Sequence, residues 1–126
     1  MNNKRTSVVI VDDDPYMRGV LRLLLRSDAY EVVGEAADGE AALELCSRLR
    51  PAVVLLDINM PNKDGLEVLD ELNMAKYAGK VVLISAEATL DKVKLAVEKG
   101  AAGFIVKPFN SGTVLNELRI CLQRTV

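Results

Sequence analysis

Residues 53–65 read VVLLDINMPNKDG, and this stretch decides the fold. Its first four residues are all apolar, which is typical of a short strand buried on both faces of a parallel sheet. The apolar run stops at Asp57, so a carboxylate stands directly at the end of the predicted strand. Four further short apolar runs, two before this stretch and two after it, lie at residues 8–11, 31–33, 81–84 and 104–106.

Segments with a helical period lie between these runs and after the last one. Before the first segment, Asp14 and Pro15 suit the N-cap and the first turn of a helix. Each segment then places apolar residues three and four positions apart, which forms one apolar face of an amphipathic helix. These residues are Met17, Val20, Leu21, Leu24 and Leu25; Ala42, Leu45, Cys46 and Leu49; Leu66, Leu69 and Leu72; Leu90, Val93 and Val97; and Val114, Leu118, Cys121 and Leu122.

Strict alternation of strand and helix predicts parallel strands joined by helices that cover both faces of the sheet. Gly34, Gly79 and Gly100 fall near the predicted breaks between elements. We therefore expect an α/β fold of the flavodoxin-like (βα)5 type, a doubly wound parallel sheet with strand order 2-1-3-4-5. The 126 residues have the size of one domain, so residues 1–126 are expected to form it, with nothing left over for an output domain.

The composition argues against several function classes. The net charge is -2, so the chain has no basic excess with which to bind nucleic acid. No apolar run approaches the roughly 20 residues that cross a bilayer, and the polar start of the chain lacks a secretory signal, so we expect a cytosolic protein without membrane contact. The absence of histidine excludes Ser-His and Cys-His catalysis. Cys46 and Cys121 lie on apolar helix faces, where we expect both to be buried.

Polar side chains follow four of the five predicted strands. They are Asp12, Asp13 and Asp14 after the first run, Asp57 and Asn59 after the third, Ser85 after the fourth and Lys107 after the fifth. In the expected strand order the first and third strands are neighbours, and ligands bind at their carboxyl ends. Asp12, Asp13 and Asp57 should therefore share one pocket. Each feature alone is commonly a helix cap or a turn, so the prediction depends on their joint placement.

The chemistry of such a pocket is restricted. Three carboxylates a few ångströms apart repel one another, so either some are protonated or a cation lies among them. Hard oxygen ligands suit Mg²⁺, which would leave Asp57 ionised and able to attack phosphorus. Lys107 and Ser85 could then contact two other phosphoryl oxygens. The sequence thus predicts a phosphoryl-transfer site with Asp57 as its nucleophile.

Four motifs in this order resemble the receiver domain of bacterial two-component response regulators. They are VVIVDDDP at 8–15, VVLLDINMPNKDG at 53–65, VVLISAE at 81–87 and GAAGFIVKPF at 100–109. The resemblance covers the whole chain and is closest to single-domain, chemotaxis-type receivers. It implies that Asp57 is the phosphorylated residue. It also implies that Mg²⁺ is bound by Asp57 itself, directly by Asp13, partly through water by Asp12, and by the backbone carbonyl of Asn59.

The resemblance implies further roles around the phosphorylated residue. Ser85 corresponds to the switch hydroxyl, Ala86 to the small residue that leaves access, and Lys107 to the lysine of the motif, with a cis bond to Pro108. Phe104 stands where many members have an inward-turning Tyr. Phe can rotate in the same way but has no hydroxyl to donate, so packing alone would carry that part of the signal.

Two positions are expected to set the lifetime of the phosphoryl group. Asn59 and Glu87 each lie two residues beyond a predicted site residue, and both would flank the path of the attacking water. Polar groups there are similar to the pairing in chemotaxis-type receivers, so we expect fairly rapid self-dephosphorylation. The domain would thus catalyse its own phosphorylation and dephosphorylation without acting on a separate substrate.

The resemblance also implies the partners. A sensor histidine kinase, a phosphotransfer protein or a small acyl phosphate would donate the phosphoryl group. A downstream protein target would bind the face formed by the fourth helix, fifth strand and fifth helix. Candidate surface residues on that face are Lys92, Lys94, Lys99 and Arg119.

Four alternatives were considered beside this interpretation. An adaptor that is never phosphorylated would not need the full set of polar side chains. A haloacid-dehalogenase-type phosphatase would need a second acid where Asn59 stands, and a flavodoxin would need a Gly/Ser/Thr-rich loop where residues 12–14 are acids. The chain could also be a receiver fragment of a DNA-binding transcriptional regulator.

Overall fold

Every predicted apolar run lies in a strand of one parallel sheet. The computed structural model describes residues 5–26 and 29–123, and within them the strand order is β2-β1-β3-β4-β5. The strands are β1 (Thr6–Val11), β2 (Tyr30–Ala36), β3 (Val53–Asp57), β4 (Lys80–Ser85) and β5 (Gly103–Val106). The helices are α1 (Pro15–Leu24), α2 (Gly39–Leu49), α3 (Gly65–Met74), α4 (Leu90–Glu98) and α5 (Ser111–Gln123).

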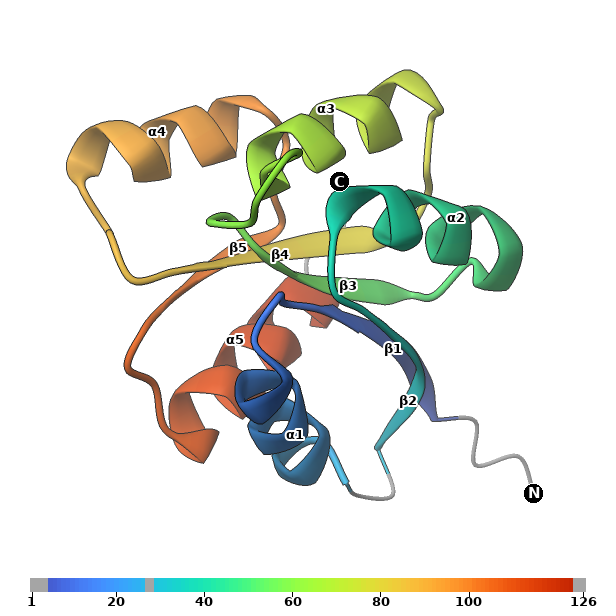
Figure 1. Ribbon diagram of the computed structural model, residues 1–126. Coiled ribbons are helices and arrows are strands. Elements are labelled where there is room, and N and C mark those ends of the chain that lie inside the picture. Colours follow the sequence, from blue (N-terminus) through green and yellow to red (C-terminus); the bar gives the residue numbers. More distant parts are fainter. Residues whose placement is uncertain (1–4, 27–28, 124–126) are drawn as a thin grey trace.

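The helices cover the sheet on both sides. Figure 1 shows α1 and α5 on one face and α2, α3 and α4 on the other. Two apolar cores fill the layers between helices and sheet. The predicted flavodoxin-like fold and strand order are confirmed. The predicted domain, residues 1–126, extends beyond the described residues at both ends, so its boundaries stay a prediction.

The central strand of the sheet is β3, which is formed by the first five residues of the 53–65 segment. All five of its residues are buried, including Asp57, because β1 and β4 flank it and helices cover both faces. Side chains of a strand alternate between faces, so Val54 and Leu56 enter one core while Val53 and Leu55 enter the other. This double burial accounts for the continuous apolar run.

The outer strand β2 is longer than predicted, and the expected break at Gly34 is wrong. The strand continues to Ala36, and the register with β1 shifts at this point, so that Val8 faces Val32 while Val9 faces Gly34. Glycine in a strand commonly marks such a bulge. A side chain at Gly34 would also approach Leu49 of α2 to 3.1 Å. The glycine thus allows close packing rather than ending the strand.

Helix starts follow the predicted chemistry. Pro15 is the first residue of α1, and the side chain of Asp14 accepts a hydrogen bond from the Tyr16 amide at 2.9 Å. At α3 the caps are reciprocal, since Asp64 accepts from the Glu67 amide and Glu67 accepts from the Asp64 amide. Such capping satisfies amides that have no partner within the helix.

The predicted apolar face of α4 is only partly buried. Leu90 is 76% exposed and Val97 is 66% exposed, although both were expected to pack inward. The buried residue of this helix is Ala96, whose small side chain packs into the core beside α3. The helix therefore rests on the sheet by a narrow contact and leaves apolar side chains at the surface.

Two other expectations can be compared with the structure. Cys46 and Cys121 are both fully buried, as predicted. Burial raises the pKa of the Cys46 thiol to about 11, so this thiol stays protonated at neutral pH. Within residues 5–26 and 29–123, no helix has the length and hydrophobicity to span a membrane.

Candidate functional site

The buried polar residues of the described chain lie at the carboxyl ends of the central strands. They are Asp12, Asp57 and Ser85, each at most 3% exposed. The parallel register brings them together, because Val11 is level with Leu56 on the neighbouring strand. The residues that follow these strands therefore face one another across the topological switch point between β1 and β3.

A lysine from the end of β5 joins the two buried carboxylates. Lys107 Nζ donates to Asp12 Oδ2 at 3.1 Å and to Asp57 Oδ2 at 3.5 Å. The bond between Lys107 and Pro108 is cis, as predicted. Asp57 Oδ1 accepts a further bond from the Asn59 amide at 3.3 Å. The site thus holds one fixed cation between two fixed anions.

Burial dominates the ionisation of Asp57. Burial and then the charge of Asp12 raise its pKa from an ordinary 3.8 to about 6, and they outweigh the opposing effects of Lys107 and the Asn59 amide. For Lys107, burial alone would lower the pKa. The hydrogen bond to Asp12 and the charge of Asp57 outweigh it, and the pKa is raised. Lys107 is therefore charged at neutral pH, and Asp57 ionises only at a cost.

A third carboxylate completes an acidic cluster. Oxygens of Asp12, Asp13 and Asp57 lie within 4.8 Å of one another, and Asp13 is exposed to solvent. With one lysine among three acids, the cluster has an excess of negative charge. Two ligands on opposite sides of one Mg²⁺ are about 4.2 Å apart, which is twice the usual bond length. The three carboxylate oxygens lie within 4.8 Å of one another, so a small side-chain movement would bring all of them within bonding distance of one ion. Hard oxygen donors with one side open to water fit Mg²⁺.

The backbone around the cluster is held by close contacts. Asp12 Oδ1 accepts from the Asp14 amide at 2.9 Å, which fixes the turn after β1. A Cβ atom at Gly65, the first residue of α3, would lie 2.5 Å from the carbonyl oxygen of Asp57. Only glycine allows α3 to begin this close to the end of β3. The packing of this helix therefore fixes the backbone that carries Asp57.

Arg18 contacts this site although no sequence pattern predicts it. Arg18 Nη1 donates to the backbone carbonyl of Asp12 at 2.6 Å, while its Nε lies 3.5 Å from Glu35 Oε1. Arg22 in turn lies 2.5 Å from Glu35 Oε2. These contacts depend on how α1 packs beside β2, so the helical pattern alone could not predict them.

Other predicted site residues lie near the cluster without joining it. Ser85 Oγ accepts from the Glu87 amide at 3.0 Å and lies 3.2 Å from the Glu87 carbonyl oxygen, so its hydrogen bonds are local. Asn59, Ala86 and Glu87 are exposed, and the Glu87 carboxylate lies 3.1 Å from Lys92 Nζ. Phe104 is half-buried, packs against the core beneath α3 and α4, and borders a cavity of about 180 Å³.

Comparison with known proteins defines the class of this fold and site. Residues 8–119 match the response regulator receiver domain, and the chain belongs to this family. Receiver domains of two-component systems bind Mg²⁺ at an acidic cluster and interact with histidine kinases and downstream targets. The chain is therefore a receiver domain and neither a haloacid-dehalogenase-type phosphatase nor a flavodoxin.

Particular relatives include both long and short proteins. The nitrate/nitrite response regulator protein NarL of Escherichia coli strain K12 is 36% identical over 118 residues, which are 93% of this chain and 55% of NarL. The chemotaxis protein CheY of Listeria monocytogenes is 39% identical over 111 residues, 88% of this chain and 93% of CheY. The chain thus spans about half the length of NarL and nearly all of this CheY.

The fold agrees with solved receiver structures. CheY of Borrelia burgdorferi, solved in a complex with CheX, BeF3 and Mg²⁺, has a TM-score of 0.90 and is 31% identical. The match covers 94% of this chain and 90% of that CheY. The response regulator domain of Thermotoga maritima CheB has a TM-score of 0.87 at 31% identity and covers 98% of this chain and 100% of that domain.

Proposed function

We propose that this receiver domain accepts a phosphoryl group on Asp57 and changes its binding to a downstream protein in response. The observation that carries the proposal is the buried Asp57 carboxylate, which shares Lys107 with Asp12 and an acidic cluster with Asp13. A histidine kinase or a phosphotransfer protein is the proposed donor. The proposed domain comprises residues 1–126, and its expected cytoplasmic location stays a prediction.

The transfer step is a displacement at phosphorus. A carboxylate oxygen of Asp57 forms a bond to phosphorus while the bond from phosphorus to the donor breaks, and the donor keeps that electron pair. The proposed Mg²⁺ ligands are Asp13, Asp57, the Asn59 carbonyl and Asp12, which acts partly through water. When bound, Mg²⁺ neutralises carboxylate charge and contacts a phosphoryl oxygen. A pKa of about 6 leaves Asp57 mostly ionised at neutral pH, and a bound cation would offset the cost of that buried charge.

The role proposed for Lys107 follows from its position. Its ammonium group already lies within hydrogen-bonding distance of both buried carboxylates, so a phosphoryl oxygen on Asp57 would meet a charge that needs little reorganisation. Asp12 remains a second partner, which keeps the lysine in place as the bond to Asp57 is replaced. Lys107 is therefore proposed to bind the phosphoryl group rather than to transfer a proton.

Ser85 is the proposed switch between the site and the surface. Its hydroxyl now bonds to the backbone of Glu87, two residues further along the chain. A phosphoryl oxygen would be a stronger, charged acceptor. Rotation of the hydroxyl towards it would release Glu87 and shift the segment that leads into α4. Phe104, which borders a cavity beside α4, is proposed to move inward by packing alone.

The proposed output surface is the face of α4, β5 and α5. Apolar side chains on these three elements are exposed, which is typical of a protein interaction site. They are Leu90, Leu95, Val97, Val106 and Leu115. Of the charged candidates, Lys92 and Lys99 pair with Glu87 and Asp70, and Arg119 donates to Asn116, while Lys94 is exposed. The apolar residues are therefore the stronger candidates for contact with a downstream protein.

Mass spectrometry of the intact protein tests the proposal. Incubation with acetyl phosphate and Mg²⁺ should add the mass of one phosphoryl group, and a chelator should prevent it. Asp57→Asn should abolish the addition, whereas Asp91→Asn, which alters an exposed acid on α4, should not. Unchanged phosphorylation of Asp57→Asn would rule out Asp57 as the acceptor.

A further inference from the structure

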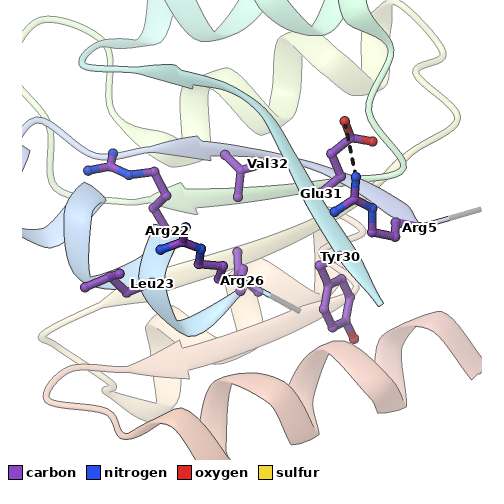
Figure 2. Close-up of a pocket in the computed structure, with 8 residues that line it drawn as sticks. Arg5, Arg22, Leu23, Arg26, Tyr30, Glu31 and Val32 are labelled. Atoms are coloured by element: carbon purple, nitrogen blue, oxygen red, sulfur yellow. Dashed lines mark ion pairs between the residues drawn. The ribbon is translucent and has the colours of Figure 1, made fainter. Parts of the chain in front are cut away.

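We propose that a groove between the end of α1 and strand β2 binds a small amphiphilic anion, with one carboxylate or phosphate group on an apolar body. The groove has a volume of about 480 Å³, within the range of small-molecule sites. Figure 2 shows Arg22, Leu23 and Arg26 contributed by the α1 side and Tyr30 and Val32 by β2. No role in the phosphorylation chemistry is assigned to this groove.

The rim of the groove is rich in arginine. Arg5, Arg22 and Arg26 line it, although the whole chain carries a net charge of -2. Arg5 is 4.0 Å from Glu31, and Arg22 is held by Glu35. Among the described residues no carboxylate lies within ion-pairing distance of Arg26. Arg26 is thus the guanidinium best placed to take a ligand's anionic group.

The residues of the rim indicate the kind of anion. All three cations are arginines, whose planar donors match two oxygens of one carboxylate or phosphate group. A lysine-rich surface would provide only mobile point charges. We therefore expect the anionic group to bind by paired hydrogen bonds to Arg26, with Arg22 close by.

The interior of the groove requires an apolar body on the ligand. Leu25 is fully buried beneath it, and Tyr30 and Val32 are half-buried along β2. Leu23 is 66% exposed and forms an open wall. An apolar ligand would cover the exposed parts of Leu23, Tyr30 and Val32 and remove them from water. A bare inorganic anion would leave these apolar side chains uncovered, so we expect such an anion to bind weakly.

The groove opens at the opposite end of β1 from the acidic cluster, and Arg22 extends from its rim towards Glu35. Arg5 precedes β1 and Tyr30 begins β2, whereas Asp12 follows the other end of β1. Six residues of strand separate the two ends by about 20 Å. Binding in the groove can therefore be distinguished, amide by amide, from binding at the phosphorylation site.

Nuclear magnetic resonance can test this site on the full chain without Mg²⁺. Titration with 4-phenylbutyrate should shift the amide signals of Leu23, Tyr30 and Val32 in a saturable way, with a dissociation constant in about the millimolar range. Phenyl phosphate, titrated separately, identifies the preferred anionic group. Acetate and 4-phenylbutanol, which each lack one half of the ligand, should bind at least about fivefold more weakly.

Two variants and one control separate a specific site from general attraction. Arg26→Gln and Leu23→Gln each alter an exposed side chain of the groove and should weaken 4-phenylbutyrate binding at least about fivefold. Arg48→Gln removes an exposed arginine from the last turn of α2 and should change nothing. The proposal is overturned if no saturable shift occurs, if Arg26→Gln binds as the wild type does, or if the largest shifts lie around Asp57.

Discussion

Asp57 combines two opposing requirements, since a nucleophile must be ionised but a buried carboxylate resists ionisation. Burial and Asp12 raise its pKa to about 6, so the native protein binds more protons than the unfolded chain between about pH 4 and 6. The free energy of unfolding should therefore fall as pH rises from about 4 to 6. Well above about pH 6, Asp57 should cause no further fall. The charge of Asp57 thus destabilises the metal-free protein at neutral pH.

Removing this charge gives the first prediction. Without Mg²⁺ at about pH 7.5, Asp57→Asn should raise the free energy of unfolding by about 1 to 2 kcal/mol, after allowance for solvent screening. At about pH 3, where Asp57 is protonated in both states, the variant and the wild type should be equally stable. Urea unfolding at several pH values measures the difference.

The control for this prediction is an exposed acid. Asp91→Asn on α4 should change the free energy of unfolding by less than about 0.5 kcal/mol at either pH. Equal stability of Asp57→Asn and the wild type at about pH 7.5 would show that the buried carboxylate carries no such penalty.

Glu87 gives a second prediction at this scale. Its side chain is exposed beside the site and paired with Lys92, where it is proposed to flank the path of the attacking water. Glu87→Leu should slow the loss of the phosphoryl group several-fold, because an apolar side chain would obstruct and dry that path. The decay of the phosphorylated mass with time measures this, with Glu98→Leu on α4 as control. Equal decay in Glu87→Leu and the wild type would count against this role.

Some residues of the site could be predicted from sequence and others could not. Asp12, Asp57 and Lys107 each stand at the carboxyl end of a parallel strand, so the fold alone brings them together. Arg18 was missed because its contact with the Asp12 carbonyl depends on the angle between α1 and β2. The local hydrogen bonds of Ser85 to Glu87 depend on the loop conformation, which no side-chain pattern encodes.

At the scale of elements, the junction of β3 and α3 positions Asp57, the proposed phosphoryl acceptor. Gly65→Ala should lower the free energy of unfolding by at least about 2 kcal/mol, because backbone atoms must move to admit the new methyl group. Its Cβ would lie 2.5 Å from the Asp57 carbonyl oxygen and 2.8 Å from Ile58 Cα. Thermal or urea unfolding measures the loss.

A glycine at the start of α5 provides a matched control. A Cβ at Gly112 would meet only the side chain of Asn110, at 3.3 Å. Gly112→Ala should therefore be neutral or more stable by up to about 1 kcal/mol, as alanine favours helix. Similar losses in both variants would mean that the close approach at Gly65 is unimportant.

The link between α1 and β2 is predicted to support metal binding. Arg18→Lys keeps the charge but cannot hold both the Asp12 carbonyl and Glu35, because lysine lacks the planar set of donors. We expect Mg²⁺ affinity to fall several-fold while the free energy of unfolding changes by less than about 1 kcal/mol. Calorimetric titration measures the affinity. Arg22→Lys, which has no contact with Asp12, is the control, and equal Mg²⁺ binding by all three proteins would contradict this role.

The elements themselves were predicted best where burial is complete. The runs that form β1, β3 and β4 are apolar throughout because helices cover both faces of the sheet. The edge strand β2 was predicted too short, since its residues are mostly half-exposed and include polar ones. On α4 the apolar pattern predicted a buried face, yet Leu90 and Val97 are exposed. Sequence pattern shows where apolar residues lie, but not whether another element covers them.

At the scale of the whole molecule, the fold separates three proposed functional regions in space. The carboxyl ends of the strands hold the acidic cluster, α4, β5 and α5 present exposed apolar side chains, and the groove beside α1 opens at the other end of β2. Figure 1 shows that the sheet lies between the two helix layers. A change at the cluster can thus reach the output face through the strand ends and loops that both regions share.

Asp57 is the proposed carrier of the phosphoryl group. Borohydride reduces an aspartyl phosphate to homoserine, so the modified position can be read by tandem mass spectrometry of the digested protein. After incubation with acetyl phosphate and Mg²⁺, the account predicts homoserine at position 57 and unmodified aspartate at positions 12 and 13. Homoserine at position 12 or 13, or no homoserine in a protein that has gained the phosphoryl mass, would contradict it.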